Sequence, residues 1–285
     1  MRKLTAMGPK LHHAAAGLCL FLAACAAPPV APPGADDGGI AAPDQSAPAA
    51  AGRITGMVID LSRKGLQGVS IRLCGTACRE VLTDSAGIFE IPNVTAQSYG
   101  LHAELPGAQP LATAKVVVPI YYYDPKVNPV LAMAPIPLPL LSPAAPLTAG
   151  KQTVALDATL SLTVDADALS FPAGVKTQQL ASVRVPPGFY PDFCLPSGDG
   201  RILAEWALGP FGTTSSAPIA VHIADNLGLA PGTTVMLSSI DPDLGSPERN
   251  SFGRVSADGK TINSVATMEL RRLTWLVVSL PRGGP

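Results

Sequence analysis

The chain has 285 residues and is 47% hydrophobic but only 14% charged, with 27 Gly and 30 Pro. This length suffices for two domains that each bury a core, and the composition favours short strands joined by turns over long solvated helices, so we expect an all-β protein. Three of the 20 basic residues lie within the first ten positions, leaving 17 bases against 21 acids. This balance excludes the basic character of nucleic-acid-binding proteins, and we expect no nucleic acid partner.

The first 24 residues have the pattern of an export signal. Arg2, Lys3 and Lys10 form a basic start, and the apolar run "AAAGLCLFLAA" follows at residues 14–24. A membrane span needs about 20 apolar residues, so this run is too short to be one. We therefore predict a signal peptide over residues 1–24.

The end of this segment, "LAAC" at residues 22–25, resembles the lipobox of bacterial lipoproteins. The resemblance implies that the thiol of Cys25 takes a diacylglyceryl group, that cleavage makes Cys25 the new amino terminus, and that acyl groups such as palmitate anchor the chain to a membrane. Ala26 follows in place of aspartate, which by the same resemblance implies the outer membrane. The alternative is a plain secretory signal followed by an incidental cysteine.

Residues 25–51 are predicted to form a lipidated, disordered tether. The segment consists mainly of Ala, Pro and Gly, with too few large apolar side chains to offset the entropy of folding. Proline extends such a chain at roughly 3.1 Å per residue, so the tether is long enough to hold a folded body several tens of Å from a membrane.

Residues 52–135 alternate short apolar runs with turns and predict the first β domain. Four motifs in this stretch, G-x-V-x-D (56–60), G-L-x-G-V (65–69), T-D-x-x-G-x-F (83–89) and P-N-V (92–94), resemble the carboxypeptidase regulatory-like domain. That resemblance implies a small prealbumin-like β-sandwich without peptidase chemistry.

His102 and Glu104 lie two residues apart in this domain, whereas a zinc carboxypeptidase needs an H-x-x-E pair and a further histidine. Residues two apart on a strand share a face, so a small site at this pair is one interpretation. The other, which we favour, is a surface cross-strand pair.

Cys74 and Cys78 bracket the three-residue loop "GTA", and a tight turn brings such a pair within disulfide reach. We predict a disulfide between them. Metal binding is the alternative, although the sequence offers no second pair to complete four ligands. Cys194 has no evident partner and is predicted to be a buried thiol.

Residues 118–147 are rich in proline, which forbids helix and restricts strands to sheet edges. We predict a proline-rich linker over residues 136–149. Within the earlier part of the stretch, Tyr121-Tyr122-Tyr123 permits two interpretations, a platform on which sugars stack or packing at an edge strand. Since consecutive strand residues point to opposite faces, at most Tyr121 and Tyr123 should share a face.

Residues 150–283 are predicted to form a second β domain, because apolar residues alternate with polar ones from Val154 to Val164 and turn signals recur downstream. Four short segments resemble ZU5-like domains, a β-rich family found in interaction proteins and bacterial envelope lipoproteins: "ALSFPAG" (168–174), "GPFG" (209–212), "APIAV" (217–221) and "GLAPGT" (228–233).

Two pairs of carboxylates in this region, Asp165 with Asp167 and Asp241 with Asp243, have the hard oxygen ligands that Ca²⁺ prefers. Asp is also an ordinary turn former, and neither pair fits an EF-hand loop, so we assign no metal. Ser215, Ser216, His222 and Asp225 supply the residue types that a serine hydrolase uses. The serines, however, do not lie in a G-x-S-x-G nucleophile elbow.

The sequence thus predicts two β-sandwich-like domains behind a signal peptide and a lipid-anchored tether. The expected function is that of a non-enzymatic lipoprotein of the bacterial cell envelope, in the outer membrane, that binds a glycan or an envelope protein or has a structural role. We assign no catalytic residue, cofactor or metal. The alternative is an envelope hydrolase with an unrecognised site.

Overall fold

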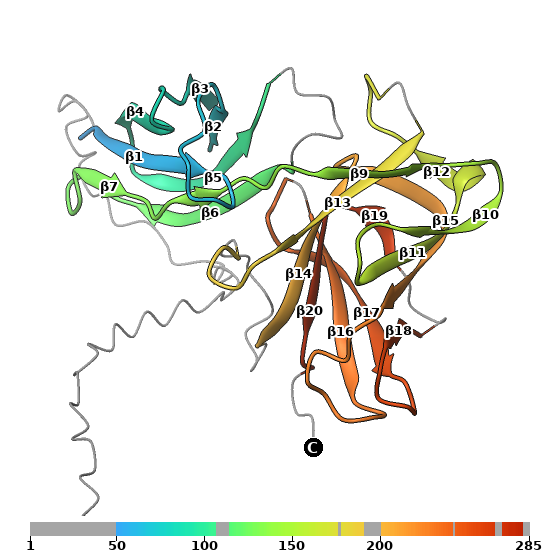
Figure 1. Cartoon of the computed structure of the whole chain (residues 1–285). Helices are drawn as coiled ribbons and strands as arrows, with labels where there is room; N and C mark the ends of the chain where they lie inside the picture. The colour runs from blue at the N-terminus through green and yellow to red at the C-terminus, as the bar shows by residue number, and fades with distance from the viewer. Residues whose placement is uncertain are drawn as a thin grey trace, which may run out of the picture. The chain divides into compact units, whose positions relative to one another are not determined.

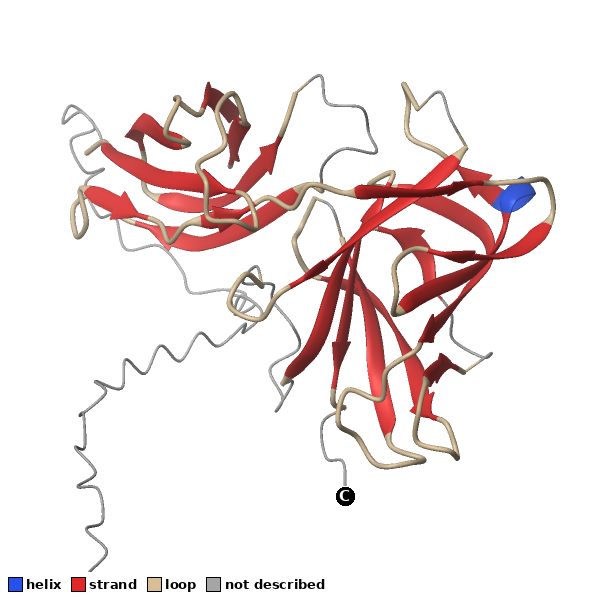
Figure 2. Ribbon diagram, in the orientation of Figure 1, coloured by secondary structure: helices blue, strands red, loops and turns tan. Residues whose placement is uncertain are grey.

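The computed structural model describes residues 50–106, 114–175, 178–190, 201–241, 243–265 and 270–281, which belong to one compact unit. Strands make up nearly all of its regular structure, and the one helix among the described residues is a single 3-10 turn, Ala166–Ala168 (Figure 2). The all-β prediction is confirmed. Within the described part, no helix has the length and apolar character needed to cross a membrane. The signal peptide, Cys25 and the tether up to residue 49 lie outside the described residues.

The amino-terminal half forms a β-sandwich (Figure 1). One sheet has the order β4-β1-β7, with β8 also pairing with β1, and the other has the order β3-β2-β5-β6. The strands are β1 (Gly52–Ile59), β2 (Ser70–Cys74), β3 (Cys78–Leu82), β4 (Ile88–Val94), β5 (Gln97–Glu104), β6 (Val116–Tyr123), β7 (Val130–Ala132) and β8 (Ile136–Pro137).

The side-chain alternation of these strands builds the core between the two sheets. Ile71 and Leu73 of β2 are buried beside Leu101 and Ala103 of β5, and β1 and β4 contribute from the other sheet. Burying each of these aliphatic side chains stabilises the fold by about 1.5–3 kcal/mol before entropy is counted. The contribution of these strands follows from the period-two pattern, and the same cluster continues into the carboxy-terminal half through Trp275 and Val277.

The T-D-x-x-G motif forms the turn that joins β3 to β4. Asp84 Oδ1 accepts hydrogen bonds from the backbone N–H groups of Ala86 (2.9 Å) and Ile88 (2.8 Å). Gly87 has φ +80°, and a Cβ there would lie 2.4 Å from the carbonyl oxygen of Val58. Only glycine satisfies both the dihedral angle and the close approach, which explains this spacing of Asp and Gly.

The carboxy-terminal half forms a twelve-stranded antiparallel sheet with the order β10-β11-β15-β18-β17-β16-β20-β14-β13-β9, to which β12 and β19 add by pairing with β15 (Figure 1). Its strands are β9 (Ser142–Pro146), β10 (Lys151–Ala155), β11 (Leu160–Asp165), β12 (Leu169–Ser170), β13 (Gln179–Val185), β14 (Ile202–Gly209), β15 (Thr213–Ile223), β16 (Thr234–Ile240), β17 (Pro247–Val255), β18 (Ile262–Ser264), β19 (Leu270–Leu273) and β20 (Trp275–Ser279).

Buried side chains from the strands of this sheet form a second hydrophobic core. The alternation predicted from Val154 to Val164 is present, since Leu160, Leu162 and Val164 are buried there together with Trp206. The likeness to ZU5-like domains stays a prediction.

The proline-rich stretch at residues 136–149 contains β8 and β9. β9 is the last strand in the order of its sheet, where the missing N–H of proline is tolerated. Leu138 is fully buried, and its N–H donates to the carbonyl oxygen of Ile59 at 2.8 Å. The division of the chain into two domains at this stretch stays a prediction.

Candidate functional site

The four candidate hydrolase residues do not come together. Ser215 Oγ donates to the carbonyl oxygen of Ala217, while the His222 ring contacts the side chain of Asn263. Ser215 and His222 lie on the same strand, β15, seven residues apart, a separation of about 20 Å at strand rise. Neither serine of the pair at 215–216 therefore has His222 as a base.

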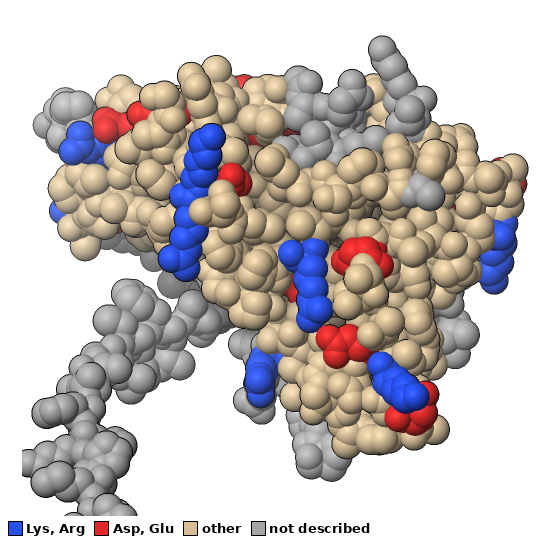
Figure 3. Space-filling model, in the orientation of Figure 1, with Lys and Arg blue, Asp and Glu red and all other residues tan. Residues whose placement is uncertain are grey.

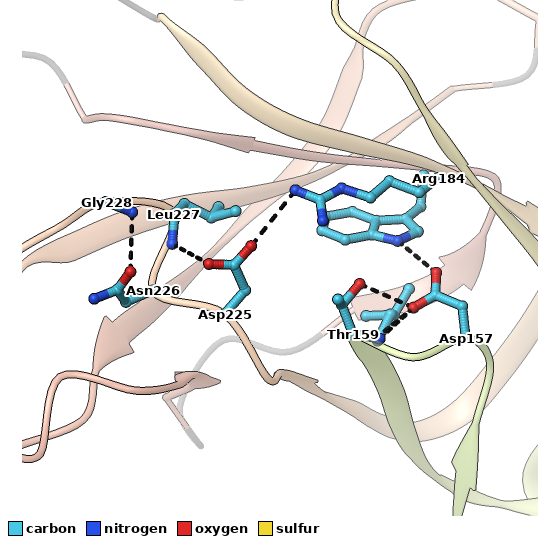
Figure 4. Close-up of polar contacts among 9 residues, drawn as sticks. Asp157, Thr159, Arg184, Asp225, Asn226, Leu227 and Gly228 are labelled. Carbon is cyan, nitrogen blue, oxygen red and sulfur yellow. Dashed lines mark hydrogen bonds and ion pairs between the residues drawn. The ribbon is translucent and has the colours of Figure 1, made fainter.

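Asp225, the fourth candidate, belongs to a polar cluster around Arg184 (Figure 4). Its Oδ2 lies 3.6 Å from Arg184 Nη2, and its Oδ1 accepts from the N–H of Leu227 at 2.9 Å. The guanidinium carbon of Arg184 lies 5.2 Å from the ring centroid of Trp206. Asp225 thus holds Arg184 over an aromatic ring and does not orient a histidine.

Asp157 completes this cluster from the other side of the indole. Its Oδ2 accepts from Trp206 Nε1 at 2.8 Å, and its Oδ1 accepts from the N–H groups of Thr159 (2.6 Å) and Leu160 (2.7 Å). Burial raises the pKa of the Asp157 carboxyl, but these hydrogen bonds outweigh burial and lower it. The carboxylate therefore fixes the indole and the turn before β11.

The candidate calcium ligands also shape turns. Asp241 Oδ1 accepts from the N–H of Asp243 at 2.7 Å, and Asp165 Oδ1 accepts from the N–H of Asp167 at 3.2 Å. Asp167 Oδ2 accepts in turn from the N–H of Gly150 at 3.1 Å. Among the described residues, no three His, Cys, Asp or Glu side chains gather as metal ligands would.

His102 differs from the expected surface pair with Glu104. It is only 7% exposed and lies opposite Arg72 on β2 and Val117 on β6, whereas Glu104 lies opposite Ser70. Burial, with the charges of Lys115 and Arg72, lowers the pKa of His102 to about 4. The surface interpretation is wrong, because residues remote in sequence cover this outer face of the sheet.

The predicted disulfide is present. Cys74 and Cys78 lie directly opposite each other where β2 meets β3, with a sulfur–sulfur distance of 2.07 Å. The covalent bond removes both thiolates as metal ligands. Cys194 lies outside the described residues.

The three tyrosines of β6 are arranged differently from the expected alternation. Gln97 of β5 lies opposite Tyr123 but Tyr99 lies opposite Ile120, so β6 has one extra residue at this point, a β-bulge. Tyr123 is consequently buried, while Tyr121 and Tyr122 are 54% and 69% exposed. The expectation that at most Tyr121 and Tyr123 share a face is wrong, because the bulge shifts the register by one and leaves the neighbours Tyr121 and Tyr122 both exposed.

A groove of about 520 Å³ lies beside Tyr121. It runs between the disulfide turn, β5 and the bulged part of β6, and is lined by Cys74, Gly75, Thr76, Gln97, Ser98, Tyr99, Pro119, Ile120 and Tyr121. Its floor thus combines one exposed aromatic ring with an amide and two hydroxyl side chains. No motif in the sequence marked this groove, and its only sequence signal was the tyrosine run.

Local packing keeps the groove in shape. A Cβ at Gly75 would lie 2.8 Å from the Gln97 side chain, so the disulfide turn packs closely on that amide. Gln97 Oε1 accepts from the N–H of Thr76 at 3.4 Å, and Ser98 Oγ donates to the carbonyl oxygen of Tyr121. These contacts hold polar groups next to an aromatic face, an arrangement suited to a ligand with hydroxyl groups and a flat apolar side.

Comparison with known proteins gives neither a matching family model nor a matching curated protein. Among solved structures, the chain is similar to a streptococcal ancillary pilin (12% identity, 82% of this chain and 54% of that chain, TM-score 0.24) and to the major pilin SpaD from Corynebacterium diphtheriae (10%, 82% and 88%, 0.27). It is also similar to fervidolysin from Fervidobacterium pennivorans, a keratinolytic enzyme related to subtilisin (11%, 82% and 33%, 0.24). The chain spans about half of the ancillary pilin and a third of fervidolysin. TM-scores this low do not establish a shared fold.

Proposed function

We propose that this chain is a non-enzymatic, lipid-anchored protein of the bacterial cell envelope that binds a neutral polysaccharide at the groove beside Tyr121. The observation that carries the proposal is the bulge in β6, which turns two consecutive tyrosines outward at the edge of a sheet. The sequence alone left open whether the three tyrosines pack at an edge strand or offer rings on which sugars stack. The exposure of Tyr121 and Tyr122 favours the stacking of sugars.

The surroundings of the groove favour a sugar over a charged ligand. Its polar lining consists of the Gln97 amide and the Thr76 and Ser98 hydroxyls, which match the donors and acceptors of sugar hydroxyls. On the face that Figure 3 shows, Lys, Arg, Asp and Glu form small separate groups within a largely uncharged surface. Among the described residues that line the groove none is charged, so a neutral polymer meets little desolvated charge there.

The anchor rests on the amino-terminal pattern. An acyl-modified Cys25 and a tether over residues 25–51 would hold the binding domain at a distance from the membrane. Polysaccharide chains of the envelope are repetitive, so weak single contacts by many anchored copies add up to firm attachment.

The test uses the chain from residue 26 onward, which keeps the whole described body and lacks the acyl group. The protein is screened on an array of bacterial surface glycans and by affinity electrophoresis in gels containing dextran, laminarin or, as an acidic control, alginate. We expect retardation by a neutral polymer, and about tenfold weaker binding for Tyr121→Ala.

The matched control is Leu82→Ala, which removes a side chain that is 60% exposed on β3 of the same sheet. Tyr121→Phe keeps the aromatic face and should retain binding. Equal retardation of the wild type, Tyr121→Ala and Leu82→Ala chains would contradict the proposed site.

A further inference from the structure

A second cavity is lined by strands of both sheets of the sandwich and shares Pro119 and Ile120 of β6 with the tyrosine groove. Its volume is about 670 Å³, within the range of roughly 300–1,000 Å³ that holds small molecules. β6 is the last strand of one sheet and β7 and β8 lie at the edge of the other, so the cavity reaches in between the two layers from this side.

The wall of the cavity is apolar over most of its extent. β1 contributes Met57 and Ile59, β6 contributes four residues from Val116 to Ile120, and the stretch from β7 to β8 contributes Leu131 and the five residues from Met133 to Pro137. Leu131, Met133 and Val118 pack against the core but are only partly buried. An unbranched, polarizable methionine adapts to a flexible ligand better than branched side chains do, and this wall has two.

The cavity lining includes a cationic side chain, that of Arg63. Arg63 lines the cavity, and its guanidinium carbon lies 5.4 Å from the centroid of the ring of Phe189, which lines the cavity too. No carboxylate lies within ion-pair distance of Arg63 among the residues that the structure describes. The neighbouring Tyr190 adds a phenol to the same rim.

The turn that carries Arg63 is held by hydrogen bonds to Asp60. Asp60 Oδ1 accepts from the N–H groups of Ser62 (2.8 Å) and Lys64 (2.9 Å), and Asp60 O accepts from the N–H of Arg63 at 3.0 Å. Arg63 has φ +68°, a left-handed conformation that costs energy for a residue with a Cβ. Asp60 Oδ1 is thus occupied by the turn, and the Arg63 side chain lines the cavity.

We propose that this cavity binds the hydrocarbon chain of an anionic amphiphile, with the carboxylate or phosphate head at Arg63. The apolar wall removes the chain from water, at roughly 0.8 kcal/mol per CH₂ in hydrophobic free energy, and the guanidinium fork matches a planar or tetrahedral oxyanion. The ligand is either a free fatty acid or the acyl chain of an anionic phospholipid.

The test is a fluorescence titration of the chain from residue 26 onward with cis-parinaric acid, a fatty acid whose emission rises in an apolar site. We expect saturable binding that palmitate displaces. Arg63→Gln should weaken parinarate binding about tenfold and leave binding of the corresponding alcohol unchanged, whereas Lys64→Gln, which removes the adjacent cation outside the cavity, should change neither.

A filled cavity provides the second arm. Ala134 is exposed and lines the cavity, so Ala134→Trp should abolish parinarate binding without altering the circular dichroism spectrum. Vesicles containing phosphatidylglycerol distinguish the two sources: displacement of parinarate by palmitate alone assigns a free fatty acid, and displacement by vesicles as well assigns the phospholipid. Binding that survives Ala134→Trp, binding that is indifferent to Arg63→Gln, or no binding at all would overturn the proposal.

Discussion

The indole Nε1 of Trp275 donates a hydrogen bond to the carbonyl oxygen of Lys115 at 2.8 Å and so joins two residues 160 positions apart. Trp275 is 1% exposed and belongs to the same core cluster as Ile54 of β1. The Lys115 side chain, close by, forms an ion pair with Asp243 at 3.3 Å. Strand β20 near the end of the chain is therefore tied directly to the start of β6.

Trp275→Phe keeps an aromatic ring but removes this donor and leaves a carbonyl oxygen without its partner. We expect a loss of about 1–2 kcal/mol in the free energy of unfolding, measured by urea denaturation. Lys115→Met is the control, because its ionic partner Asp243 is 78% exposed in its side chain and such pairs contribute at most about 1 kcal/mol. A larger loss in the control than in Trp275→Phe would contradict this assignment.

The same measurement bears on the predicted division at residues 136–149. Two independently folding domains can give two unfolding transitions, whereas a single cooperative unit gives one. A single transition for the whole chain would contradict independent folding of residues 52–135 and 150–283.

Glu205 of β14 is fully buried, and among the described residues neither of its carboxyl oxygens has a hydrogen-bond partner. Burial raises the pKa of this carboxyl well above its usual range. The unfolded chain ionises above about pH 4.3 while the folded chain keeps the proton, so stability is full below that pH and falls as the pH rises.

Glu205→Met removes this buried acid at similar volume. We expect the variant to be more stable than the wild type by about 1–3 kcal/mol near pH 8, with a smaller difference at pH 4, in urea titrations at both values. A difference between the two chains that does not change with pH would contradict an unpaired, titrating Glu205.

His102 should impose the opposite pH dependence. Its folded pKa of about 4 lies below the ordinary value of 6.5, because of burial and the nearby charges of Lys115 and Arg72, with Asp243 acting in the other direction. The unfolded chain therefore takes up the proton first as the pH falls, and stability present above pH 6.5 is lost down to about pH 4. The loss attributable to this group is about 2–3 kcal/mol.

His102→Gln should flatten the stability profile between pH 7 and pH 4, measured by urea denaturation at half-unit intervals. His222→Gln is the control, since that histidine lies on β15 beside Asn263 and not in the sandwich. Equal flattening by both substitutions would show that the buried site of His102 is not the cause.

Parts of this fold were predictable because they depend on residues close in sequence. The alternation from Leu160 to Val164 fixes the buried face of β11, and Asp84 with Gly87 fixes a turn through local hydrogen bonds. The disulfide joins residues four apart at the end of one hairpin. In each case the interaction that decides the structure lies within a few residues.

The candidate sites depended on partners that are remote in sequence. Whether Tyr121 and Tyr122 are both exposed depends on the register between β6 and β5. A single bulge in β6 changes which of the tyrosines are exposed. His102 is buried because residues far away in the sequence cover its face of the sheet. Gly245, for example, approaches Val117, which is the cross-strand neighbour of His102. The cavity at Arg63 likewise needs Phe189, more than a hundred residues away.

The amino-terminal anchor gives a prediction of its own. Only a thiol at the lipobox accepts the diacylglyceryl group, so Cys25→Ser should abolish incorporation of radioactive palmitate and move the chain out of the membrane fraction. Cys19→Ser, which changes the other cysteine of the signal region, should leave labelling intact. Undiminished labelling of Cys25→Ser would contradict lipid anchoring at this residue.

The disulfide connects the fold to the proposed binding groove. Replacing both Cys74 and Cys78 by serine opens a loop far shorter than the 15 residues for which a bridge contributes roughly 3 kcal/mol, so the free energy of unfolding should fall by less than that. The turn that packs on Gln97 loses its constraint, however, and the groove loses one wall. We therefore expect polysaccharide binding to weaken about tenfold while the circular dichroism spectrum and urea midpoint change little.

Affinity electrophoresis of the oxidised, reduced and doubly substituted chains measures this separation of binding from stability. Binding that is identical in all three would show that the turn does not shape the groove.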